Sequence, residues 1–534
     1  MLKATTGFLL GCYYWCAVVS CKSTSRLDWA AVINKYAQKK EDSLYLQSAI
    51  FLKTNMNKQA AEKTIYYNER TATAQDIGLD TISSYASWTN VLATQQLIIK
   101  KQWLPDTAIL TNDLIEENIE DAVDTWKKLP YKNRCSWQIF LEYVLPYKIL
   151  NEYPQSWRKK VRKAFAPVTN GIHYNDHFAI SLMDTINGNV KEWFAFNVHQ
   201  SPGTWQELVA FKNGDCVAIS CLMAFAGRSY GIPVAIDHCP IWANINGLNH
   251  YWNALLQPGK KCLPFMGGES NPGAYNPFLL FETILPGANK STYKKCGKVF
   301  RHVFTANNKS IRQWTQNDAS IPYTLSDEHV IDVTKEYYSV TDITVNVPGY
   351  TNQKIVYLCV YNNGQWVPTA WDTVTTHHKA IFKDMANDRL YLPAFFSDGM
   401  VTPINHPFIA DSAGTHFLEP AQKRKITVSI KYLASIEQEQ VDLYSQVDEL
   451  QWNNFAKKQQ GLAAGKNRAV VKNGELYALY YWDNDWKLFS TVSGAKGRAK
   501  FLMVPANCLY KIVAAGSEGR ERVFTFCNGS QQWW

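Results

Sequence analysis

The hydrophobic periodicity of this chain changes near residue 300, and this change limits the possible folds more than any other feature. Before it, apolar residues recur at helical spacing, as at Trp29, Val32 and Tyr36. After it, apolar and polar residues alternate, as in residues 342–347 and 354–361. A chain of 534 residues also exceeds what one hydrophobic core supports. We therefore expect a multidomain α+β protein with a helical N-terminal region and C-terminal β-sandwich domains.

Cys216 stands where a helix is predicted to begin. It follows Gly214-Asp215 and precedes an apolar run of helical spacing over residues 217–228, which Gly231-Ile232-Pro233 ends. The unpaired N–H groups and the helix dipole at this end favour a thiolate over a thiol, and they can hold an oxyanion. We therefore expect Cys216 to be a partly ionised nucleophile, with a buried structural cysteine as the alternative.

Two predicted strands after this helix supply partners for a nucleophilic thiol. Residues 234–237 and 248–256 have strand composition, and His250 in the second strand would take the proton of the thiol. The carboxylate that orients the imidazole has to come from another segment, and Glu269 is our choice. Asp237 is the reserve for the same role.

A turn and a predicted helix start precede the thiol at residues 201–206. Trp205 and Gln206 in this stretch are candidates to bind substrate near the oxyanion. For Trp205, packing in the core is the alternative. Nearby, Cys221 and Cys239 are interpreted as buried structural residues.

The order of three motifs resembles the transglutaminase-like superfamily, which is related in layout to papain-type thiol enzymes. The motifs are Gly214-Asp215-Cys216, the stretch from Arg228 to Pro233 with Gly-Ile-Pro at its end, and His250-Tyr251-Trp252-Asn253. The resemblance implies a Cys-His-acid site on one helix and two strands. The family usually offers Asp as the acid, whereas the first acidic residue after His250 here is Glu269.

Other segments are similar to a narrower group, the transglutaminase-domain lipoproteins of Bacteroidetes-type bacteria. These segments are residues 140–147, 157–158, 265–273 and 391–395, and the resemblance covers most of residues 26–534. It implies the architecture and hardly constrains the substrate. The function we expect is that of a cell-envelope thiol hydrolase, which cleaves an amide or peptide bond of a peptide or glycopeptide through an acyl-enzyme, because water is always available as acceptor. A protein-crosslinking transglutaminase and a non-catalytic peptide- or glycan-binding scaffold are the alternatives.

Five segments follow from the periodicity and the motifs. We expect a lipoprotein signal peptide over residues 1–20, a helical region over residues 21–200, a papain- or transglutaminase-like thiol core over residues 201–300, a β-sandwich domain over residues 301–424 and a C-terminal β domain over residues 425–534.

The N-terminus has the pattern of a bacterial lipoprotein signal. An uncharged run ends at Val18-Val19-Ser20-Cys21, so we expect Cys21 to be acylated and the protein to be held on a membrane of the cell envelope. Leu10-Gly11-Cys12 is a weaker, earlier match to the same signal. Lys22 after Cys21 fits sorting to the outer membrane. The formal charge of +9 is spread over short basic runs, which argues against a nucleic-acid partner.

Cysteines and aromatic residues complete the candidate list. The chain has no CxxC pair, so no metal site is indicated, and no motif calls for a cofactor. Cys508 and Cys527 either form a disulfide or are free thiols. Aromatic residues near the C-terminus invite a carbohydrate-stacking interpretation, with core packing as the alternative. They are Tyr481, Trp482, Trp486, Trp533 and Trp534.

Overall fold

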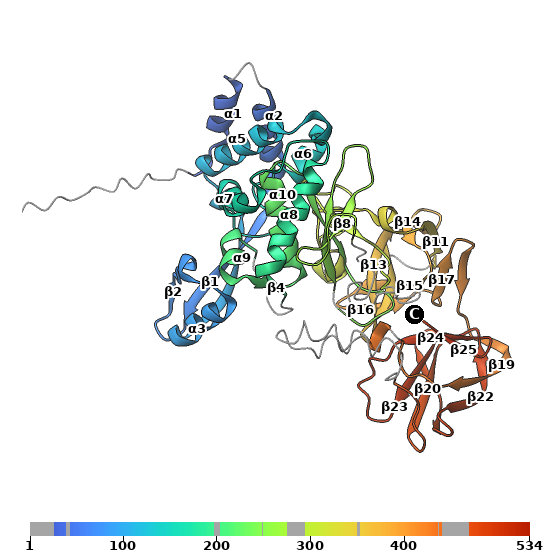
Figure 1. The fold of residues 1–534 in the computed structure, drawn as a ribbon. Coiled ribbons are helices and arrows are strands. Elements are labelled where there is room, and N and C mark those ends of the chain that lie inside the picture. Colours follow the sequence, from blue (N-terminus) through green and yellow to red (C-terminus); the bar gives the residue numbers. More distant parts are fainter. Residues whose placement is uncertain are drawn as a thin grey trace, which may run out of the picture.

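The protein is α+β, with most of its helices before residue 230 and most of its strands after it. The computed structural model describes residues 26–38, 43–196, 203–247, 249–274, 294–349, 353–435, 437–439 and 469–534. In Figure 1 the helices lie at one end and the β-rich part, with the C-terminus, at the other. The predicted signal peptide and Cys21 lie outside the described residues. Within those residues, no helix has both the length and the apolar composition that crossing a bilayer requires.

The first helices share one hydrophobic core. They are α1 (Trp29–Ala37), α2 (Ser43–Asn55), α5 (Asn112–Lys128) and α6 (Trp137–Tyr143), with the shorter α3 (Tyr85–Gln95) and α4 (Asp106–Ile109) nearby in sequence. On α5 the side chains of Ile115, Ile119 and Ala122 recur at helical spacing and are fully buried in this core. Thr111 caps α5 by accepting a hydrogen bond from the Leu114 N–H at 3.3 Å.

A three-stranded antiparallel sheet lies within the region that we predicted to be mostly helical. Its strands are β1 (Ala60–Asn68), β2 (Thr73–Gln75) and β3 (Leu97–Pro105). Strands β1 and β3 pair along their whole length, from Ala60 opposite Pro105 to Asn68 opposite Leu97. Most side chains of β3 are exposed, so its sequence lacks the alternation of apolar and polar residues that predicts a half-buried strand. The helical prediction was wrong at these strands for that reason.

The thiol-bearing part has helices on a five-stranded antiparallel sheet. The helices are α7 (Arg158–Thr169), α8 (Phe178–Trp193), α9 (Trp205–Phe211) and α10 (Cys216–Ser229). The strands, in sheet order, are β10 (Val330–Asp332), β9 (Phe300–His302), β6 (Val234–Cys239), β7 (His250–Leu255) and β8 (Leu263–Phe265). Helix α10 packs on this sheet, where the Asn253 side chain donates a hydrogen bond to the Ser220 carbonyl at 2.9 Å. The helix and both strands predicted around Cys216 and His250 are confirmed.

This sheet crosses the domain boundary that we drew at residue 300. Strands β9 and β10 follow that boundary in sequence, yet β9 pairs with β6. An ion pair between Arg301 on β9 and Asp237 on β6 joins the two strands, with both side chains buried. The short helix α11 (Thr334–Tyr337) follows β10, and the Tyr337 hydroxyl also donates to Asp237. The thiol-bearing sheet is therefore completed by residues beyond 300.

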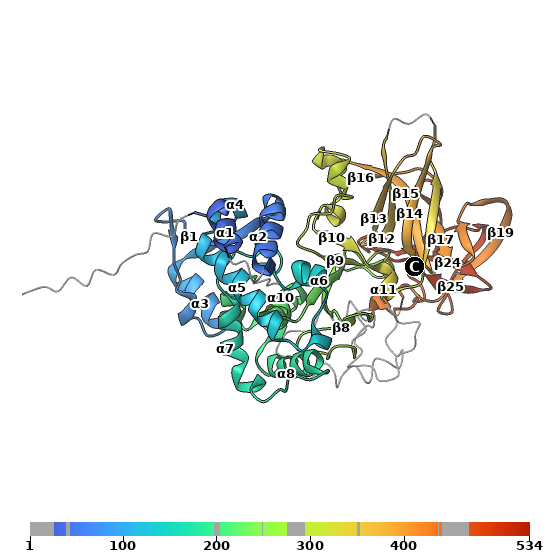
Figure 2. The ribbon, with the colours of Figure 1, turned by 90° about the horizontal axis from the view of Figure 1, so that it is seen from above.

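Two groups of strands form the C-terminal part (Figure 1), and Figure 2 shows this part on the side of the molecule away from α1, α2 and α5. The first has β11 (Val340–Asn346) paired with β14 (Lys379–Ala386), and a sheet of β13 (Gln365–Thr373), β12 (Ile355–Asn362), β15 (Arg389–Ser397), β17 (Phe408–Asp411) and β18 (Gly414–Phe417), with β16 (Met400–Pro403) on β15. The second has β19 (Ala421–Ile430) paired with β22 (Ala499–Ala506), and a sheet of β21 (Trp486–Ser493), β20 (Leu476–Trp482), β23 (Tyr510–Ala514), β24 (Val523–Cys527) and β25 (Ser530–Trp533). The predicted hairpin turn at Asn363-Gly364 is confirmed, and both residues have positive φ, 50° and 84°.

The structure decides between the alternatives that the sequence left open for the C-terminal aromatic residues and cysteines. Trp482 and Trp534 are buried in one core cluster, which fits the packing alternative, and Tyr481, Trp486 and Trp533 are half-buried. Cys508 is a buried free thiol that donates to the Pro505 carbonyl, and Cys527 is an exposed free thiol. The possible disulfide between these two cysteines is therefore not formed.

Candidate functional site

Cys216 is the first residue of α10, as the sequence predicted. Asp215 is the N-cap residue, and its carboxylate accepts a hydrogen bond from the Ala218 N–H at 3.0 Å. The Cys216 side chain is half-buried, and its thiol accepts a hydrogen bond from the backbone N–H of Tyr251. Because Tyr251 directly follows His250, the start of β7 lies against the N-terminus of α10.

The prediction that the Cys216 thiol is partly ionised is wrong. Burial and the neighbouring carboxylate of Asp215 raise the pKa of Cys216 to about 12, although the Tyr251 N–H and Lys294 act in the opposite direction. The helix N-terminus is thus outweighed, because desolvation disfavours the charged form and the capping carboxylate repels it. The thiol is therefore neutral at physiological pH.

His250 is the first residue of β7 and pairs across the ladder with Cys239. Its ring lies near two indoles, with centroids 6.1 Å from Trp242 and 5.8 Å from Trp252. Burial, and then the charge of Lys294, hold the pKa of His250 well below its ordinary value. The imidazole is therefore neutral and able to accept a proton.

Glu269 lies on a tight turn after β8, and this turn is held by two helices. Asn187 on α8 accepts a hydrogen bond from the Gly268 N–H at 2.7 Å and donates to the Ser270 carbonyl at 3.0 Å. A Cβ on Gly267 would lie 2.7 Å from a side-chain carbon of Ile219 on α10, so only glycine fits there. Glu269 is exposed, yet the surrounding protein atoms partly desolvate its carboxyl group and so raise its pKa.

Lys294 is the charged residue that connects these groups, and the sequence analysis missed it. Burial lowers the pKa of Lys294, whereas Glu269 and Cys216 act to raise it. Its charge in turn lowers the pKa values of Cys216, His250 and Glu269. Its ammonium also lies 4.7 Å from the ring centroid of Trp242. The charge of Lys294 therefore acts on Cys216, His250 and Glu269 alike, and no sequence motif marks this lysine.

Asp237, the reserve acid, is held by other partners. Both of its carboxylate oxygens accept hydrogen bonds from Arg301, at 2.7 and 2.8 Å, and one also accepts from the Tyr337 hydroxyl at 2.5 Å. The side chain is fully buried, and in the ladder Asp237 lies opposite Trp252 and not His250. This arrangement gives Asp237 a structural role in joining β6 to β9.

The other sequence candidates lie in or near the core. Trp205 is buried, and its ring packs edge-on against Phe165 and Phe225, so core packing accounts for it. Gln206 is half-buried on α9. Cys221 and Cys239 are buried free thiols, as expected. In the part of the chain that the structure describes, no group of three His, Cys, Asp or Glu side chains could hold a metal ion.

Comparison with known proteins adds little to this geometry. No family model matches the chain, and no curated protein matches it. Among solved structures, it is similar to the crystal structure of red sea bream transglutaminase at 8% sequence identity and a TM-score of 0.20, over 91% of this chain and 79% of that one. A superposition this poor does not establish a shared fold.

Proposed function

We propose that this chain is a thiol hydrolase of the transglutaminase-like type, which cleaves an amide bond through an acyl-enzyme. Cys216 attacks the carbonyl carbon while its proton passes to His250. The imidazolium then protonates the departing amine, which leaves a thioester on Cys216. Water attacks this thioester, gives its proton to His250, and releases the acid and the thiol.

The observation that supports this proposal most directly is the charge coupling at Lys294. A half-buried thiol at a helix N-terminus, a neutral imidazole and a carboxyl group all interact with the charge of this one ammonium. The N–H groups at the start of α10 are the donors that a tetrahedral oxyanion requires. Glu269 balances the charge of Lys294, and it is our choice for the acidic member of the site.

The raised thiol pKa and the lowered imidazole pKa define how this site would work. Both groups rest in their neutral forms, so proton transfer from Cys216 to His250 accompanies the attack and does not precede it. Lys294 stabilises the sulfur anion as it develops, because a nearby cation favours the charged form of a thiol. Water serves as acceptor in preference to an amine, because excluding water requires a closed site.

The cellular setting belongs to the same proposal. Acylation of Cys21 would hold the enzyme on a membrane of the bacterial cell envelope, where peptides or glycopeptides are the substrates. We also expect the C-terminal β domains to contact carbohydrate. Tyr481, Trp486 and Trp533 are only half-buried, so part of each ring is accessible to a sugar.

Acylation by p-nitrophenyl acetate tests the proposal. The Cys216 thiol should displace p-nitrophenolate and carry the acetyl group, which intact-mass measurement and peptide mapping detect. Cys216→Ala should abolish this adduct, and His250→Gln should slow its formation by about 100-fold or more. Cys527→Ser removes an exposed thiol away from this site and is the matched control.

Two outcomes would favour other functions. If an added primary amine is consumed in place of water, the chain is a crosslinking transglutaminase. If the folded protein acquires no acetyl group at Cys216, the catalytic reading fails and a binding scaffold is the better account.

A further inference from the structure

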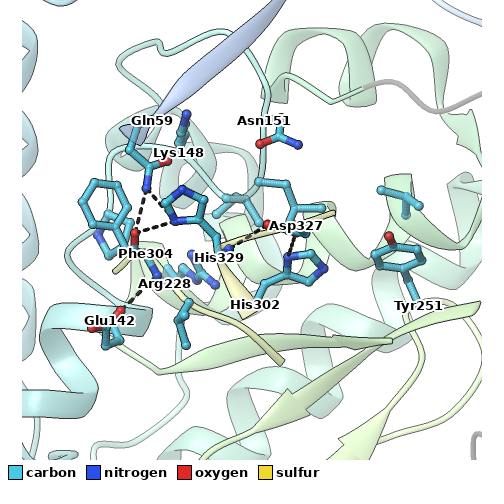
Figure 3. A pocket seen from close by; sticks show the side chains of 15 residues that line it. Gln59, Glu142, Lys148, Asn151, Arg228, Tyr251, His302, Phe304, Asp327 and His329 are labelled. Carbon is cyan, nitrogen blue, oxygen red and sulfur yellow. Dashed lines mark hydrogen bonds and ion pairs between the residues drawn. The ribbon is translucent and has the colours of Figure 1, made fainter. Parts of the chain in front are cut away.

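A polar cavity of about 190 Å³ has neighbours of the candidate thiol among its lining residues. Figure 3 shows the side chains that line this cavity. Val217, which follows Cys216, and Tyr251, whose N–H contacts the thiol, line one part of it. Arg228, near the end of the same helix, lines another part. Because residues 217 and 228 of an α-helix lie about 16 Å apart, the cavity runs along α10 from the thiol end towards the guanidinium.

Arg228 is a buried cation with unused donors. Its side chain is 3% exposed, and its Nε donates to the Val234 carbonyl at 3.0 Å. Neither terminal amino group has a hydrogen bond or an ion pair among the described residues. Arg158 is equally buried, yet Nε and both terminal groups donate, for example to Asn118 at 2.8 Å. Leaving the terminal amino groups of a buried guanidinium without partners is unfavourable, so these donors of Arg228 point to a ligand.

The other charged side chains of the cavity already have protein partners. Lys148 forms an ion pair with Asp106 at 2.7 Å. Glu142 accepts hydrogen bonds from two backbone N–H groups at 2.9 and 3.0 Å. Asp327 lies 3.3 Å from His302, and its carboxylate also accepts from a backbone N–H at 2.7 Å. The charge of Glu152 also acts on Arg228, but its two carboxylate oxygens accept hydrogen bonds from the Ile149 and Leu150 N–H groups, and the two side chains form no ion pair. The terminal donors of Arg228 therefore remain open to a further anion.

We propose that Arg228 binds the C-terminal carboxylate of the peptide whose amide bond reaches Cys216. The planar guanidinium offers two parallel donors to a carboxylate. The arginine side chain spans part of the 16 Å, so about three extended residues, each of roughly 3.3 Å, separate the carboxylate from the cleaved bond. This inference rests on the proposed function, and it makes the chain selective for bonds near a free C-terminus.

Calorimetric titration with two peptides tests this site. The protein is the full chain with Cys216→Ser, which binds without turnover, and the ligands are acetyl-tetraalanine with a free C-terminus and its C-terminal amide. We expect the free acid to bind at least tenfold more tightly. Adding Arg228→Gln should make the two affinities equal. An amidated peptide with aspartate at the third position has a side-chain carboxylate and no terminal one. Its affinity therefore shows which of the two carboxylates the site binds.

A second variant protects the test if Arg228→Gln does not fold. Asn151 is exposed and lines the same cavity, so Asn151→Asp adds a negative charge without disturbing the core. It should weaken binding of the free acid several-fold and leave the amide unchanged. Equal affinity for both peptides in the Cys216→Ser protein would overturn the inference, as would a preference that survives both variants. A preference in a chain that p-nitrophenyl acetate does not acylate would refute the catalytic function and not the carboxylate site.

Discussion

Replacing Asp215 by asparagine should make Cys216 react faster, because the change removes a negative charge that disfavours the thiolate. The carboxylate of Asp215 is a cause of the raised pKa of Cys216, second to burial. Asparagine caps a helix as well as aspartate does, so the bond to the Ala218 N–H at 3.0 Å should persist. The substitution therefore removes a charge and leaves the local fold.

The size of the effect follows from the separation of neighbouring side chains. Two charges about 6 Å apart at an effective dielectric constant of ~20 interact by about 2.8 kcal/mol, which is about two pKa units. Because Cys216 is only half-buried, solvent and salt screen part of this interaction. We therefore expect the pKa of Cys216 to fall by about one to two units. A lower pKa gives more thiolate, but a thiolate from a more acidic thiol is also less nucleophilic, with a Brønsted slope of about 0.5. The net gain in rate is therefore about 3- to 10-fold.

The assay is alkylation by iodoacetamide near pH ~7.5, resolved by mass mapping. The reagent is uncharged, so Asp215 influences the rate through the thiol and not through attraction of the reagent. The exposed Cys527 is an internal reference whose rate should stay constant. An unchanged or slower rate at Cys216, with the reference constant, would refute the electrostatic account of this thiol.

Three further predictions concern other parts of the chain. Lys294→Met should slow alkylation of Cys216 and raise the pKa of His250, measured by NMR titration, because Lys294 lowers both pKa values; an unchanged His250 titration would contradict this. Arg301→Met should lower the free energy of unfolding by about 3 kcal/mol or more in urea, because it leaves Asp237 buried without its cation. Lys487→Met, in an exposed pair, is the control and should cost less than about 1 kcal/mol. Cys21→Ala should release the protein from the membrane fraction, and a processed variant that still sediments with membranes would argue against acylation there.

Local sequence signals predicted the elements that carry the candidate site. The apolar spacing after Cys216 predicted α10, and the Gly-Ile-Pro stretch correctly marked its end. Period-two patterning predicted β7 with His250, and the Asn363-Gly364 pair predicted a hairpin turn. These features depend on residues adjacent in sequence, which is why periodicity and turn chemistry were sufficient.

Tertiary structure decided the rest, because burial and charge depend on residues far apart in sequence. The exposed strand β3 had no apolar alternation to reveal it, and pairing with β1 made it a strand. The thiol pKa follows from desolvation by the folded chain and from Asp215, which outweigh the helix N-terminus that sequence alone could identify. The charge of Lys294 acts on the site from a segment with no motif, and Arg228 became a candidate ligand residue only when folding buried its guanidinium without an ion pair.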